Sequence, residues 1–134
     1  NFKNPLATLN PQDFWRRWHI SLSEWLRDVV FMPIYKALSK TAYFGRHRLA
    51  AQNIGIFATL LAMGVWNGLA WHYIVSGVMF GAYSVGHNLL VNAARTRPAW
   101  QTVLAYPAIK FAGRVLTLVL VALALYVFSG RSPI

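Results

Sequence analysis

Residues 10–28 alternate between apolar and polar side chains with the period of an α-helix. At about 100° per residue the apolar and aromatic side chains fall on one arc and the charged ones on the opposite arc. The first arc holds Phe14, Trp25, Trp18, Leu22, Trp15, Leu26 and His19, and the second holds Ser23, Arg16, Arg27, Glu24, Arg17, Asp28 and Ser21. With Asn10 as N-cap and Pro11 at the first helical position, the pattern predicts an amphipathic helix with His19 at the edge of an aromatic face.

A short apolar stretch follows at residues 29–38, and Pro33 interrupts it. Ten residues cannot cross roughly 30 Å of hydrocarbon, so we expect a re-entrant or interfacial segment and not a full span. Residues 36–48 are then basic and contain no acid, which predicts a loop on the cytosolic side. Its basic side chains are Lys36, Lys40, Arg46, His47 and Arg48.

No Lys, Arg, Asp or Glu occurs between residues 49 and 94, a segment long enough for two spans of about 20 residues each. The Asn67-Gly68 dipeptide is a strong turn signal, so we expect two helices folded back on each other. Basic residues flank the start of the first span and the end of the second, which places these two ends on one side of the membrane. A second basic loop is expected at 95–110 and a third span at 111–129, with Arg114 near its start. Five glycines would let the helices approach closely: Gly55, Gly64, Gly77, Gly81 and Gly86.

The composition agrees with a membrane protein. Hydrophobic residues make up 57% of the chain and charged residues 12%, about half the share of charge in soluble proteins. The net charge of +10 could suit nucleic acid, but the Lys and Arg residues flank apolar segments and form no single stripe, so we expect no nucleic-acid partner. The absence of cysteine excludes disulfides, a thiol nucleophile and thiolate metal sites. Because the chain begins with Asn1, we expect a piece of a longer protein.

Candidate chemistry rests on a few ionisable residues beside the apolar segments. All three acids lie on one predicted helix, which disfavours a two-carboxylate hydrolase. His72 and His87 would lie about 22 Å apart along a straight helix, so a metal site is not expected. A single histidine acting as general base fits better. For His19 and His72 the alternative is a structural role in a membrane-surface helix or an aromatic belt.

The run from Phe14 to Ser23, followed by Trp25-Leu26-Arg27-Asp28, resembles the signature of the bacterial membrane-bound O-acyltransferases. The resemblance extends to residues 63–68, where the family usually has Trp-His-Gly and this chain has Trp66-Asn67-Gly68. It covers essentially residues 1–134, as the C-terminal part of one acyltransferase domain. The ending at 126–130 is similar to the branch that moves D-alanine onto lipoteichoic acid. The alginate O-acetyltransferase branch tends to have Gly-Gly where Tyr35-Lys36 stands here.

The resemblance implies an all-α integral membrane bundle, with about three transmembrane helices in this part, in the cell membrane. It implies an acyl donor held as a thioester on the phosphopantetheine arm of an acyl carrier protein, with no bound cofactor and no metal. The acceptor would be a hydroxyl of lipoteichoic acid or a polysaccharide. Donor and acceptor would meet in a tunnel, to which we assign Trp15, Trp18, Trp66 and Trp71. Arg46 and Arg48 are expected to contact the carrier or anionic lipid.

Asn67 departs from the family pattern, because asparagine cannot act as a base although it can donate to an oxyanion. Three interpretations follow. His19 is the base with Asn67 in support, or His72 has taken the role, or this member is inactive. The function predicted is O-acyl transfer of a D-alanyl group, with alginate-type acetylation or a non-catalytic membrane component of the same fold as alternatives.

Overall fold

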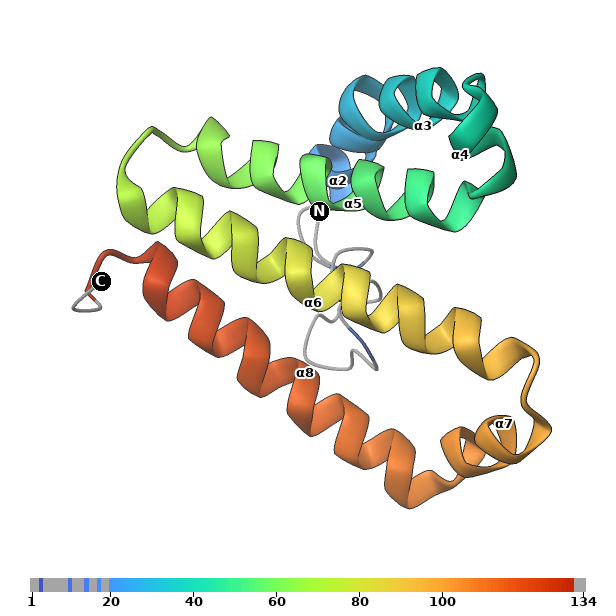
Figure 1. The fold of residues 1–134 in the computed structure, drawn as a ribbon. Coiled ribbons are helices and arrows are strands. Elements are labelled where there is room, and N and C mark those ends of the chain that lie inside the picture. The colour runs from blue at the N-terminus through green and yellow to red at the C-terminus, as the bar shows by residue number, and fades with distance from the viewer. Residues whose placement is uncertain (1–2, 4–9, 11–13, 15–16, 18–19, 132–134) are drawn as a thin grey trace.

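The computed structural model describes residues 3, 10, 14, 17 and 20–131, and the elements in this part are all helices (Figure 1). Three of them are long and apolar enough to cross a membrane: α5 (Arg48–Trp66), α6 (Trp71–Arg95) and α8 (Pro107–Phe128). The shorter elements are α2 (Ile20–Leu26), the π-helical turn η2 (Arg27–Phe31), α3 (Met32–Ser39), α4 (Ala42–Arg46) and α7 (Pro98–Ala105). The predicted all-α fold with three spans is confirmed, and the chain is a multi-pass membrane protein.

Helix α6 lies between α5 and α8, and α3 packs against the other side of α5 (Figure 1). The predicted turn joins α5 to α6, with Gly68 at a φ of 149°, where a residue without a Cβ is favoured. Helix α7 connects the far end of α6 to the start of α8. The C-terminal ends of α5 and α8 therefore lie beside the start of α6.

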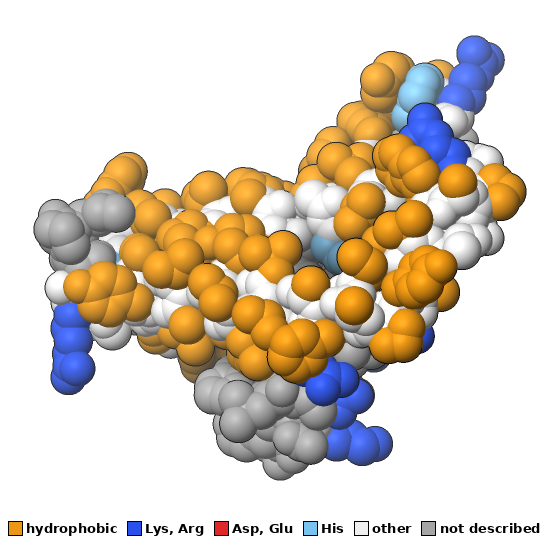
Figure 2. All heavy atoms as spheres, turned by 90° about the horizontal axis from the view of Figure 1, so that it is seen from below, with side chains coloured by type: hydrophobic (Ala, Val, Ile, Leu, Met, Phe, Trp, Pro, Cys, Tyr) orange, Lys and Arg blue, Asp and Glu red, His pale blue; other side chains and the backbone are white. Residues whose placement is uncertain are grey.

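The outer surface is apolar between basic margins. Figure 2 shows hydrophobic side chains over the middle of one face and Lys and Arg side chains at its edges. Along α8 the exposed residues include Phe111, Leu116, Val119 and Leu123. Such a surface suits hydrocarbon and not water.

Glycines bring α5 and α6 close together. A Cβ placed on Gly64 would lie 2.5 Å from the carbonyl oxygen of Tyr73 and 3.0 Å from the Cα of Gly77. A Cβ on Gly81 would meet the ring of Phe57 at 2.7 Å. These positions behave as expected for small residues at a membrane helix interface. Gly86 was expected to do the same, but a Cβ there meets no atom within 4 Å.

The prediction that Pro33 breaks the apolar stretch was wrong. Leu26, Phe31 and Met32 all have helical φ and ψ, so α2, η2 and α3 follow one another without interruption. Proline removes one N–H and its ring crowds the carbonyl four residues earlier. The π-helical turn ends at Phe31, two residues before Pro33, and its wider winding accommodates that loss.

Two segments expected to be loops are largely helical. Within 36–48, α3 continues to Ser39 and α4 begins after Thr41, whose Oγ1 accepts a hydrogen bond from the Phe44 N–H at 3.2 Å. Within 95–110, α7 begins at Pro98. Threonine as N-cap and proline at the first helical position are start signals for helices. The sequence interpretation missed these signals because both segments are basic and were therefore expected to be loops.

The topology gives a first testable prediction. Lys40 lies at the end of the bundle that carries Arg46, Arg48 and Arg95, and Arg131 follows α8 at the opposite end. In the full-length protein in intact cells, a membrane-impermeant maleimide should label Arg131→Cys and should label Lys40→Cys only after permeabilisation, because basic segments stay in the cytosol. Both side chains are exposed, so access does not limit labelling. Equal labelling of both from outside would contradict this topology.

Candidate functional site

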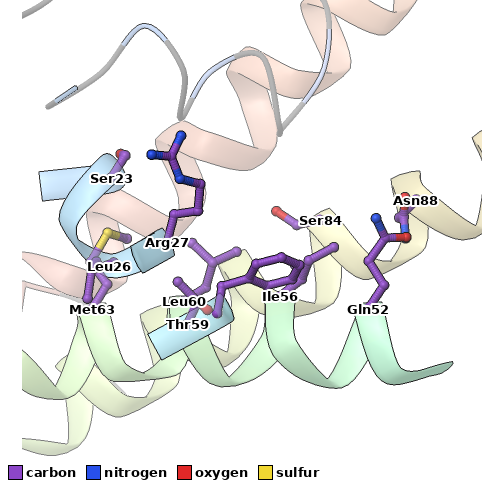
Figure 3. A pocket seen from close by; sticks show the side chains of 11 residues that line it. Ser23, Leu26, Arg27, Gln52, Ile56, Thr59, Leu60, Met63, Ser84 and Asn88 are labelled. Atoms are coloured by element: carbon purple, nitrogen blue, oxygen red, sulfur yellow. The ribbon is translucent and has the colours of Figure 1, made fainter. Parts of the chain in front are cut away.

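A cavity of about 260 Å³ lies between α2–η2 on one side and α5 and α6 on the other (Figure 3). Most of its wall is apolar, from Leu26, Phe31, Ile56, Leu60 and Met63. Six polar residues also line it: Ser23, Arg27, Gln52, Thr59, Ser84 and Asn88. We call this space the first cavity. An apolar pocket with a few polar groups is the usual form of a ligand site.

Amide side chains join α5 to α6 at one end of the first cavity. The Nδ2 of Asn88 donates hydrogen bonds to Oε1 of Gln52 at 3.1 Å and to Oδ1 of Asn53 at 2.7 Å. Hydrogen bonds of this kind hold helices together where water is absent. Figure 3 shows Gln52 and Asn88 side by side, facing each other from the two helices.

Ser84 brings an unsatisfied hydroxyl to the first cavity. Its side chain is 1% exposed, and its Oγ has no hydrogen-bond partner in the described part of the chain. Figure 3 shows the hydroxyl pointing away from α6 into the cavity. Ser76, on the same helix and also 1% exposed, differs because its Oγ donates to the Tyr73 carbonyl at 3.1 Å. An unpaired buried hydroxyl costs about 1–3 kcal/mol, so Ser84 is suited to meet a polar group of a ligand.

A second cavity, of about 230 Å³, lies at the C-terminal end of α5. Its lining includes Trp66, Asn67, Ser76 and Phe128. Met63 borders both cavities, and α2 contributes Leu26 to the first and Leu22 to the second. The two cavities therefore adjoin, and the stretch of α5 from Gln52 to Asn67 that lines them is about 22 Å long.

Asn67 is one of two predicted site residues that the structure places at a cavity wall, the other being Trp66. Asn67 caps α5, and its Nδ2 donates to the Met63 carbonyl at 2.9 Å, which leaves the second amide hydrogen for another acceptor. Trp66 borders the same cavity but is 65% exposed. Trp71 is also 65% exposed and is not among the residues that line either cavity.

His72 supports the wall of the second cavity without lining it. Its Nδ1 lies 2.8 Å from the carbonyl oxygen of Phe128. A carbonyl can only accept, so Nδ1 carries the proton. The ring packs 4.1 Å from that of Tyr73, centroid to centroid, and a Cβ on Gly130 would lie 3.3 Å from its Nε2. His72 thus ties the start of α6 to the end of α8.

The helix that carries the aromatic arc is oriented differently from the prediction. Phe14 and Leu26 are buried as expected, but Trp25 is 51% exposed, and Ser23 and Arg27 from the polar arc line the first cavity. Arg27 also pairs with Asp28 at 2.9 Å, and this hydrogen bond and charge raise the pKa of Arg27 above its usual value. His19, Trp15 and Trp18 lie outside the described residues, so their roles remain predictions.

Comparison with known proteins identifies the family. No protein-family profile matches the chain. It is 36% identical over 136 residues to the teichoic acid D-alanyltransferase of Bacillus subtilis, and this alignment covers 98% of this chain and 32% of that protein. It is 35% identical over 97 residues to the teichoic acid D-alanyltransferase of Streptococcus thermophilus, an alignment that covers 72% of this chain and 22% of that protein. It is 34% identical over 95 residues to the peptidoglycan O-acetyltransferase of Helicobacter pylori, an alignment that covers 71% of this chain and 16% of that protein. The chain belongs to the membrane-bound O-acyltransferase family.

The chain spans about a third of the length of its relative from Bacillus subtilis. Within this part, the structure brings Asn67, Trp66 and the α2 helix together around adjoining cavities. Sequence reasoning missed Ser84, Gln52 and Asn88. Ser84 and Asn88 are one helical turn apart in a segment without charge, and this spacing of polar residues was the available signal.

Proposed function

We propose that this chain is part of a membrane enzyme that transfers a D-alanyl group from a carrier-bound thioester to a hydroxyl of a cell-envelope polymer, such as lipoteichoic acid. The observation that carries this proposal is the 36% identity to a teichoic acid D-alanyltransferase over nearly the whole chain. The adjoining cavities along α5 support it, because they offer a path on which two substrates can meet.

The reaction is a direct acyl transfer. The acceptor hydroxyl oxygen attacks the thioester carbonyl carbon, a C–O bond forms, and the C–S bond breaks. The hydroxyl proton passes to a base and then to the departing sulfur, which leaves as a thiol. His19 is the base in this proposal, and the free amide hydrogen of Asn67 stabilises the oxyanion that develops on the carbonyl oxygen.

The first cavity suits the arm that carries the thioester. A phosphopantetheine arm is an extended chain with two amide groups between apolar segments. The apolar walls match its methylene groups, and the Ser84 hydroxyl and the amides of Gln52 and Asn88 match its polar groups. The carrier is acidic in this proposal, and exposed Arg46 and Arg48 contact the carrier or the lipid headgroups, since residues 29–134 contain no acid that would compensate them.

The proposal is tested by reconstitution. The full-length protein in liposomes, given a carrier loaded with labelled D-alanine and lipoteichoic acid, should transfer the label to the polymer, and the rate should fall with rising ionic strength. Transfer from an acetyl thioester instead would favour O-acetylation, which the identity to a peptidoglycan O-acetyltransferase also supports. Absence of transfer from either donor would contradict an acyltransferase and favour a non-catalytic member.

Ser84 gives a sharper prediction about the donor. Ser84→Ala should raise the KM for the loaded carrier about tenfold with little change in kcat, because one hydrogen bond to a bound substrate is worth about 1–1.5 kcal/mol. Thr117→Val is the matched control: it removes another buried hydroxyl, which donates to the Gly113 carbonyl at 2.8 Å within α8. If Ser84→Ala stabilises the protein and leaves the KM unchanged, the first cavity does not hold the donor.

A further inference from the structure

The largest of the cavities described here, about 670 Å³, is separate from those along α5. It lies between α6 and α8 beside α7, and its walls are mainly apolar. Gly86 opens it on the α6 side, since a Cβ there meets no atom within 4 Å. Lys110, in the first turn of α8, is its only Lys or Arg among the described lining residues. We call this space the lateral cavity.

Two cations lie near the start of α8: Lys110 lines the lateral cavity, and Arg114 follows it in the helix without lining the cavity. Lys110 and Arg114 are one turn apart on α8, where like charges repel. In the described part of the chain neither has an acidic partner, and the enclosed Nε of Arg114 has no hydrogen-bond acceptor. An unpaired arginine within a span is costly, so an anion from outside the chain would stabilise this arrangement.

The surroundings place these cations at the membrane surface. Helix α7 precedes them, with the Arg97 guanidinium 4.5 Å above the ring of Trp100, and Tyr106 is exposed at the start of α8. Aromatic and basic residues gather in this way at the level of the lipid headgroups. The three acids of the chain are at 13, 24 and 28, so none belongs to α6, α7 or α8.

We infer that the lateral cavity binds an anionic phospholipid of the bilayer, with its phosphate at Lys110 and Arg114 and an acyl chain between α6 and α8. A free anion would leave the apolar walls uncovered, and a neutral lipid would leave the two cations unpaired. An amphiphile with a negatively charged head satisfies both features. This inference concerns a lipid site and does not depend on the proposed acyl transfer.

The test uses the purified full-length protein in neutral detergent. Native mass spectrometry should show one phosphatidylglycerol molecule retained at least about tenfold more strongly than phosphatidylcholine, since about 1.4 kcal/mol corresponds to tenfold. Gly86→Leu, which places a side chain in the open space, should abolish this retention without lowering the thermal midpoint. Lys110→Gln should reduce it, and Lys36→Gln, which removes an exposed cation elsewhere, should not.

Other results would overturn the inference. Equal retention of both lipids in the unmutated protein would show that the cations do not select the headgroup. If no lipid is retained and Gly86→Leu lowers the thermal midpoint, another part of the full-length protein fills the lateral cavity. Equal losses from Lys110→Gln and Lys36→Gln would indicate attraction by net charge alone.

Discussion

Replacing Gly64 by alanine is expected to weaken the packing of α5 against α6 by about 2–3 kcal/mol, within the range for overpacking a tight contact. The added Cβ would lie 2.5 Å from the Tyr73 carbonyl oxygen and 3.0 Å from the Gly77 Cα. Both are backbone atoms, so no side chain can rotate away. The helices must separate, and the second cavity, which Gly64 and Gly77 line, must change with them.

The matched control is Gly86→Ala, which adds the same methyl group to α6 where nothing lies within 4 Å. It should leave stability unchanged or raise it by up to about 1 kcal/mol, because alanine favours the helical state over glycine. Thermal unfolding of the full-length protein in detergent, followed by size-exclusion chromatography, measures both variants. If Gly64→Ala unfolds at the same temperature as Gly86→Ala, the close approach at Gly64 does not stabilise the hairpin.

Much of this fold could be predicted from the sequence because lipid imposes simple rules. A charge-free segment with one Asn-Gly turn predicts a helical hairpin, since in lipid every backbone N–H and C=O group must find its hydrogen-bond partner within a helix. The turn at Gly68 and the three spans agree with that argument. The short helices α4 and α7 were missed, because charge dominated the interpretation of segments that also contain Thr41 and Pro98 as start signals.

The candidate site could be predicted only in part, because it depends on how helices face one another. Helical periodicity placed Trp25 on the buried arc and Ser23 on the polar one, yet Trp25 is exposed and Ser23 lines the first cavity. The period is correct, but the direction in which a helix turns its buried stripe is decided by its neighbours. Likewise, no local pattern brings His72 to the carbonyl of Phe128, which is 56 positions later in the chain.

The interaction of His72 sharpens the distinction between the three interpretations of the base. A histidine that donates through Nδ1 to the Phe128 carbonyl and packs against Gly130 can hold the wall of the second cavity in place. Asparagine can retain this donor, because its Nδ2 occupies nearly the position of the imidazole Nδ1, but it cannot accept a proton as a base. His72→Asn therefore separates a positioning role from a basic one, and His72→Ala removes both.

If His19 is the base, His19→Ala in the full-length enzyme should lower the transfer rate about 10²–10⁴-fold, the usual range for general base catalysis. His72→Asn should then retain most of the transfer activity, and His72→Ala should lose less activity than His19→Ala. The activity of Asn67→Ala should lie between those of His72→Ala and His19→Ala, because this variant loses one positioned hydrogen bond. Asn67→His would restore the Trp-His-Gly pattern and should raise the rate. If His72→Asn is as inactive as His72→Ala while His19→Ala retains activity, His72 is the base. If neither histidine matters in an active enzyme, the proposed mechanism is wrong, since no other histidine or acid lies beside the cavity that Asn67 borders in the described part of the chain.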